Sequence, residues 1–335
     1  MMQERLLEND FDVVHDSLDF PWDDRIHAPL LVETAKQAVT PGEFRLREEM
    51  DLLSRQWRSI LGSLFILVYL VLMVFLNLAF YRYEPPETGK RLKDLGYELI
   101  PHLPDEYAAV VDLPLTFMYV FVGIVLGATL RVCVPCRRGA RITEEDHEVP
   151  YIVNMLRRFA LCYAAGHVLR AMTYLVTTIP GGNNKCLDEA LLKYSKPTLP
   201  ECFYRTASVT SNCGDLMFSG HLLLCTLLLC ITNRYVSKAM GISRRGRRAY
   251  LSLGILLTVW EFVMIIASRH HYTADCIVAL YFTPALWFCF EYYIPHDLVP
   301  DRVHIARSII ERKRIRVLSV SSMSSAARLP DILTV

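Results

Sequence analysis

Long apolar segments dominate the pattern of hydrophobic and polar positions along this chain. A membrane-spanning helix needs about 20 mostly apolar residues, and six segments come close to that length or exceed it. They are residues 59–81, 113–130, 159–179, 216–232, 249–268 and 272–293. Lipid offers no partner for free backbone groups, so each segment is predicted to be helical. The pattern predicts an all-α membrane protein with six transmembrane helices and both termini on one side.

Composition supports a membrane protein. Of the 335 residues, 53% are hydrophobic, and the mean hydropathy is +0.26. Soluble domains are usually less apolar than this. The formal net charge is +1, so no basic excess points to nucleic acid as a partner. The N-terminal segment is acidic and has no apolar core, so we expect no cleavable signal peptide.

Lys and Arg in the short connections predict the orientation. "RVCVPCRRGAR" follows the second span, "NRYVSKAMGISRRGRRAY" follows the fourth, and "ERKRIR" follows the sixth. Basic connections stay on the cytosolic side, so both termini are predicted to be cytosolic. We expect three parts: a cytosolic segment over 1–56 that contains an amphipathic helix, a catalytic membrane domain over 57–294, and a basic, Ser-rich cytosolic tail over 295–335.

Two polar clusters lie at the opposite, lumenal ends of the spans. "CGDLMFSGH" ends at His221, and "SRHHYTAD" contains His271 and Asp275. Residues four apart share one helix face, so Asp275 is expected to reach the ring of His271 and orient it. Ionisable groups at such depths are costly and are often functional. The sequence therefore predicts a lumenal site with two histidines and one carboxylate.

These side chains suit phosphoryl transfer without a metal. One histidine can attack phosphorus, and the other can protonate the departing alcohol and deprotonate the incoming one. Three alternatives remain open: Ser219 as the nucleophile, metal binding by His221, His271 and Asp275, and histidines that only cap helices at the membrane interface. No second ligand pair has metal-site spacing, so we expect neither a metal nor a cofactor.

The two clusters resemble the paired signatures of the sphingomyelin synthase family. This family includes ceramide phosphoethanolamine synthases and inositol phosphorylceramide synthases, and it is related to type-2 phosphatidic acid phosphatases. Two further segments are similar to family motifs: "KDLGYELIPHLPD" (93–105) and "LRAMTYLVTTIPGG" (169–182). The glycine-rich stretch that often precedes "CGD" in the family is missing here.

The resemblance implies transfer of a phospho-alcohol from a glycerophospholipid to the primary hydroxyl of ceramide, with release of diacylglycerol. It implies that His271 is the nucleophile, that Asp275 is its partner, and that His221 is the general acid and base. Asp215 matches a further acidic position of the motif. The donor headgroup stays open among choline, ethanolamine and inositol, and the Ser-Arg before the histidines favours inositol or mixed donors.

Several other residues are candidates for substrate contacts or for structural support. Ser219 and Arg269 are expected near the headgroup, and Arg269 would attract the phosphate. Arg170 and Glu261 have similar predicted depths, so we expect them to pair across the bundle or to line the headgroup cavity together. The lumen is an oxidising compartment, so we predict a disulfide between Cys186 and Cys202 in the lumenal loop.

The rival function is a lipid phosphate phosphatase that uses the same site with water as acceptor. The sequence lacks the Lys-x6-Arg-Pro signature of such enzymes, and only one residue separates Arg269 from His271. Both observations favour the transferase. The expected partners are ceramide, a glycerophospholipid and the bilayer, and a homo-oligomer is compatible with the sequence. We expect a multi-pass protein of the Golgi, with the endoplasmic reticulum and the plasma membrane as alternatives.

Overall fold

The computed structural model describes residues 24–84, 91–104, 106, 108–131, 149–183, 186, 196–206, 213–294 and 298–313. The Ser-rich tail and most of the basic connection after the second span lie outside these ranges. Within them every regular element is a helix, and six helices are long and apolar enough to cross a membrane. The predicted six-helix, all-α fold is therefore confirmed.

The chain divides into two compact units. The smaller one combines residues from both ends of the chain and contains α2 (Asp24–Ala38), the beginning of α3 (Pro41–Phe65) and a helix over residues 302–313. Its apolar core consists of Leu31, Ala35, Phe44, Ile305, Ala306, Ile309 and Ile310. An ion pair between Arg302 and Glu48, at 2.7 Å, adds a polar contact between two of these helices.

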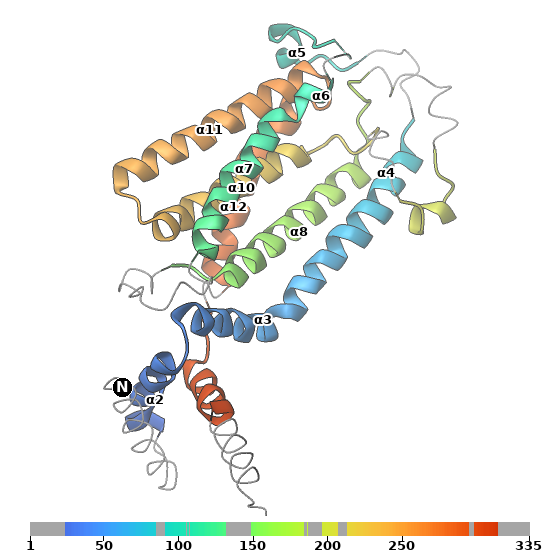
Figure 1. Ribbon diagram of the computed structural model, residues 1–335. Coiled ribbons are helices and arrows are strands. Elements are labelled where there is room, and N and C mark those ends of the chain that lie inside the picture. Colours follow the sequence, from blue (N-terminus) through green and yellow to red (C-terminus); the bar gives the residue numbers. More distant parts are fainter. Residues whose placement is uncertain are drawn as a thin grey trace, which may run out of the picture. The chain divides into compact units, whose positions relative to one another are not determined.

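The larger unit is a bundle of the apolar helices (Figure 1). The first span runs through the rest of α3, a π-helix η1 (Ile66–Phe75) and α4 (Leu76–Arg82). The others are α7 (Leu113–Leu130), α8 (Ile152–Val176), α10 (Gly220–Met240), α11 (Arg244–Ala267) and α12 (Thr273–Tyr293). Short α5 (Leu95–Leu99) and α6 (Ala108–Val111) lie in the connection before α7.

Helix α10 is the centre of this bundle. It packs against α7, α8, α11 and α12, and 67% of its apolar window is buried, more than in any other candidate span. Its side chains contribute to three apolar clusters, around Leu223, Leu228 and Val236. A helix surrounded on all sides by protein is a rigid support for side chains in its first turn, which is where His221 lies.

The fourth span begins four residues later than its apolar pattern predicts. The hydroxyl of Ser219 accepts a hydrogen bond from the N–H of Leu222 at 3.5 Å and caps α10. Ser at this position satisfies a free backbone donor of the first turn. Residues 213–218 therefore form a loop in front of the helix, and this loop contributes to the site described below.

The predicted disulfide is wrong. Cys186 is bonded to Cys213, and Cys202 is a buried free thiol. Cys202 lies in η5 (Pro200–Phe203), where its thiol donates to the carbonyl oxygen of Thr198 at 3.4 Å. Cys186 and Cys213 instead pack together against Phe80 and Tyr83. The bond attaches the loop before α10 to the segment that follows α8.

Candidate active site

Both histidine clusters lie at the same end of the bundle. His221 is in the first turn of α10, and His271 lies in the short connection between α11 and α12. The centroids of the two rings are 6.5 Å apart. A reacting atom in a near-attack arrangement lies about 3–3.5 Å from the group that attacks it. One phosphorus atom therefore fits between the rings.

His271 is buried, and its ring is held by backbone. Its Nδ1 lies 2.8 Å from the carbonyl oxygen of Leu216, in the loop before α10. A carbonyl only accepts hydrogen bonds, so Nδ1 carries the proton and the lone pair of Nε2 stays free. Burial, followed by the charges of Arg170 and His221, lowers the pKa of His271 well below its ordinary value of 6.5. A neutral imidazole with a free Nε2 is a competent nucleophile.

Asp275 has a different local role from the one predicted. Its carboxylate is 3.9 Å from Nδ1 of His271, which is beyond hydrogen-bond distance. It accepts instead from the N–H of Tyr272 at 3.1 Å and completes a capping box at the start of α12. Asp275 therefore supports the beginning of α12 beside His271, while the orientation of the ring depends on Leu216.

His221 has more polar and more exposed surroundings. Its side chain is 35% exposed, and Nε2 is 3.5 Å from Oδ1 of Asp112, in the turn between α6 and α7. This hydrogen bond lowers the pKa of the Asp112 carboxyl. A carboxylate beside an imidazole orients it and stabilises its protonated form. Asp112 is thus a partner of His221 that sequence analysis missed.

Arg170 and Asp215 form an ion pair that shapes the loop before α10. The guanidinium lies 2.6 Å from the Asp215 carboxylate and also donates to the backbone carbonyls of Asp215 and Phe218, at 2.8 and 2.6 Å. Both side chains are buried. The predicted pairing of Arg170 with Glu261 is wrong, because Asp215 occupies the guanidinium. This ion pair holds the loop that supplies the Leu216 carbonyl.

Arg269 is also bound to backbone. Its guanidinium donates to the carbonyl oxygens of Tyr97, Ile100 and Ile266, at 3.0, 3.1 and 3.3 Å, and lies over the ring of Tyr97. Its φ of 61° is in the left-handed region, which is unusual for a residue other than glycine. Arg269 therefore stabilises the sharp turn that presents His271. His270 is exposed and contacts Ser268.

Residues 93–105, which contain the sequence Asp-Leu-Gly, form hydrogen bonds to this turn. The Asp94 carboxylate accepts from the N–H of Thr273 at 2.8 Å and from its hydroxyl at 2.6 Å. The Tyr97 hydroxyl donates to the carbonyl oxygen of His271 at 3.1 Å. Asp94 thus caps α12 from a distant part of the chain. The motif itself was visible in the sequence, but nothing there indicated its partner.

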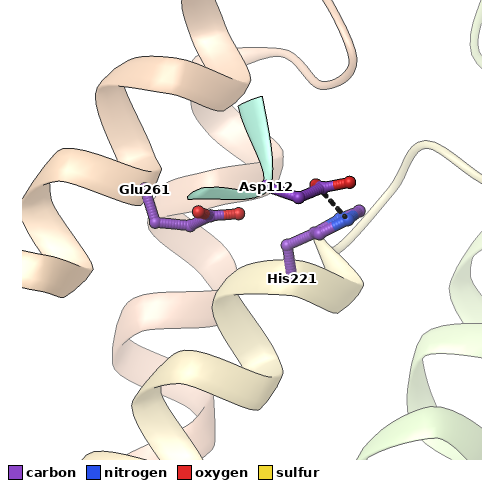
Figure 2. A group of neighbouring side chains, drawn as sticks. All are labelled: Asp112, His221 and Glu261. Atoms are coloured by element: carbon purple, nitrogen blue, oxygen red, sulfur yellow. Dashed lines mark ion pairs between the residues drawn. The ribbon is translucent and has the colours of Figure 1, made fainter. Parts of the chain in front are cut away.

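Ser219 and Glu261 are the remaining predicted residues. The hydroxyl of Ser219 is buried and caps α10, so it has a structural function. Glu261, on α11, is fully buried and lies beside His221 and Asp112 (Figure 2). The structure thus brings His221, His271 and Asp275 together, and it assigns Arg170, Asp215 and Arg269 to the support of the surrounding loops.

Comparison with known proteins identifies similar enzymes. Residues 212–293, which contain both histidine clusters, match the family model described as PAP2 superfamily C-terminal. The chain is 26% identical over 272 residues to phosphatidylinositol:ceramide inositolphosphotransferase 2 of Arabidopsis thaliana, covering 80% of this chain and 79% of that protein. It is 26% identical over 247 residues to phosphatidylethanolamine:ceramide ethanolaminephosphotransferase of Trypanosoma brucei brucei, covering 66% and 72%.

A third relative is phosphatidylinositol:ceramide inositolphosphotransferase of Leishmania major. It is 28% identical over 244 residues, covering 65% of this chain and 70% of that protein. The matches confirm the resemblance to the sphingolipid synthases and to their phosphatase superfamily. The relatives are ceramide phosphotransferases that are named for different headgroups.

Proposed function

We propose that this chain transfers a phospho-alcohol from a glycerophospholipid to the primary hydroxyl of ceramide and releases diacylglycerol. The observation that carries the proposal is the pair of rings at one end of the bundle, 6.5 Å apart. One imidazole is buried with Nδ1 on a carbonyl, and the other is half-exposed beside a carboxylate. The similarity to ceramide phosphotransferases supports the same reaction.

The reaction has two steps at phosphorus. Nε2 of His271 attacks the phosphodiester, the bond between phosphorus and the diacylglycerol oxygen breaks, and His221 gives its proton to that oxygen. Ceramide then gives its hydroxyl proton to His221 and attacks the phosphohistidine, and the phosphorus–nitrogen bond breaks. Protons and charges balance, and both histidines return to their initial states. Asp112 supports the protonated form of His221, and Asp275 supports the charge that develops on His271.

The proposed orientation places the site on the lumenal side. The helix ends opposite the histidines, where α10 ends and α11 begins, carry a run of basic residues: Arg234, Lys238, Arg244, Arg245, Arg247 and Arg248. Such residues remain cytosolic, so both termini are cytosolic and the active site is lumenal. A glycosylation tag in residues 182–212 should be modified, and a tag in 236–248 should not. The reverse pattern would contradict this orientation.

The donor is decided by experiment. The chain is reconstituted with labelled ceramide and, in turn, phosphatidylinositol, phosphatidylethanolamine or phosphatidylcholine, and the products are identified by mass spectrometry. A phosphosphingolipid with at least one donor supports the proposal. Free phosphate from a lipid phosphate monoester, without any phosphosphingolipid, would indicate the phosphatase instead. We propose the Golgi as the compartment, and co-localisation of the tagged full chain with Golgi markers tests this.

A further inference from the structure

A buried acidic side chain on α11 is unexplained by the proposed reaction. Glu261 has 0% exposure, and neither of its carboxylate oxygens has a hydrogen-bond partner of normal geometry. The backbone of Leu115 lies near the carboxylate but does not meet hydrogen-bond geometry. An unpartnered carboxylate in an apolar bundle is costly, so a site of this kind calls for a proton, a cation or another compensating group.

The neighbours of Glu261 supply a set of ligands that points to a cation. One ligand atom each of Asp112, His221 and Glu261 lies within 4.8 Å of the others. Figure 2 shows the Glu261 carboxylate directed toward the ion pair between the other two side chains. The three residues come from the turn before α7, from α10 and from α11, so they converge only in the folded bundle.

We propose that Asp112, His221 and Glu261 form a binding site for a divalent transition-metal cation such as Zn²⁺. Imidazole nitrogen and carboxylate oxygen are ordinary zinc ligands, and three protein ligands with one open position are a common arrangement. The site is also accessible, because the Asp112 side chain is 66% exposed while Glu261 is buried below it. A bound cation compensates the Glu261 charge that protein groups leave unpaired.

Occupancy of this site has a consequence for catalysis, and this part rests on the proposed function. Nε2 of His221 faces Asp112 and is the atom that carries the transferred proton in the proposed reaction. A metal bound at this nitrogen occupies its lone pair, and it prevents proton transfer to and from the lipid oxygens. Zinc therefore inhibits the transferase, and removal of the metal restores it.

The direct test measures metal and uses no lipid substrate. The full chain, purified in detergent with a tag that contains no histidine, is dialysed against ZnCl₂, and bound zinc is measured by mass spectrometry of the metal. We expect Asp112→Asn and Glu261→Gln each to weaken binding at one site by at least about tenfold. Glu98→Gln, at an exposed position of α5, is the matched control and should bind like the wild type.

The variants separate binding from misfolding. Asp112 is exposed, so Asp112→Asn leaves the core intact and tests the site even where Glu261→Gln lowers stability. Thermal unfolding of each variant in detergent verifies the fold. Zinc binding that is absent from the wild type, or unchanged in both folded variants, would overturn the proposal.

A second measurement concerns inhibition. Zinc should slow ceramide transfer by the wild type, a chelator should reverse the effect, and Asp112→Asn should need about tenfold more zinc for half-inhibition. Equal sensitivity of the two proteins would overturn the inhibitory role. Failure of all transfer activity would contradict the proposed function, and the binding experiment would still decide the metal site.

Discussion

The two histidines of the site have contrasting surroundings. His271 is 6% exposed, its Nδ1 is bound to the Leu216 carbonyl, and a distant segment caps the helix that follows it. The side chain of His221 is 35% exposed, and the groups around it are the carboxylates of Asp112 and Glu261. The first environment is buried and bound to backbone, and the second is partly exposed and rich in carboxylates.

In the proposed reaction, this difference allows one residue type to perform two functions. Burial lowers the pKa of His271, so the ring is neutral near pH 7 and can attack phosphorus. His221 has access to water and carboxylate partners, which suit a group that gains and loses a proton in every cycle. Solvation and neighbours separate a nucleophile from an acid–base catalyst. The following substitutions and measurements test this contrast.

Replacement of His271 by Ala should have the largest effect. General acid–base assistance contributes about 10²–10⁴-fold, and loss of the nucleophile should exceed that range. Transfer of labelled headgroup to ceramide is the measurement. The matched control is His270→Ala, because His270 is an exposed neighbouring imidazole whose ring lies beside the Ser268 hydroxyl. A well-folded His271→Ala protein with normal transfer would contradict the mechanism.

Replacement of His221 by Ala should reduce transfer by about 10²–10⁴-fold. The reason is that diacylglycerol would leave as an unprotonated alkoxide. Release of labelled diacylglycerol and formation of phosphosphingolipid, measured in parallel, should fall together. Rapid release of diacylglycerol by this variant, with only the second step slowed, would show that another group protonates the leaving oxygen.

Asp275→Asn should be milder than either histidine variant. The amide oxygen can still accept from Tyr272, and the Leu216 carbonyl still orients the ring, so only the charge 3.9 Å from Nδ1 is lost. We expect a loss of about 5–30-fold in rate, equivalent to about 1–2 kcal/mol. Asp275→Ala also removes the cap and should lower the thermal stability as well. Equal effects of both variants on rate and stability would argue that the charge is unimportant.

Asp94→Ala should act by loosening the turn that positions His271. It removes the acceptor for the N–H and hydroxyl of Thr273, so the turn that holds His271 loses its external brace. Loss of an N-cap costs about 0.5–2 kcal/mol, which thermal unfolding in detergent measures. Asp94→Asn, which keeps one acceptor oxygen, should recover most of that stability and of the transfer rate. No rescue by Asn would show that the charge of Asp94 matters more than its hydrogen bonds.

The last test concerns the pH dependence of stability. The folded pKa of His271 is below the unfolded value of about 6.5, so the unfolded chain binds the extra proton more readily. Stability should be fully present above pH 6.5 and fall at lower pH, by up to about 1.4 kcal/mol per unit. Unfolding of the wild type and of His271→Asn between pH 5 and 8 is the comparison. Identical slopes would show that the imidazole is not held neutral.

Much of the fold and of the site could be predicted from local sequence. Apolar runs of spanning length must become helices in lipid, so the six spans were predictable, and the second was predicted with its observed ends, Leu113 and Leu130. The alternation of connections between the two ends of the bundle placed His221 and His271 at the same end. The spacing between His271 and Asp275 indicated proximity, and the two side chains lie 3.9 Å apart without a hydrogen bond.

The remaining contacts join residues that are far apart in the chain, so they depend on how the helices and loops pack. Arg170 could have paired with several acids of similar depth, and the loop before α10 brought Asp215 to it. Cys186 is bonded to Cys213 and not to Cys202. Packing decides which thiols meet, and distance along the sequence does not determine packing. Asp94 and Asp112 acquired their roles in the same way. Local chemistry thus determined which groups can react, and the packing of the helices determined which of them meet.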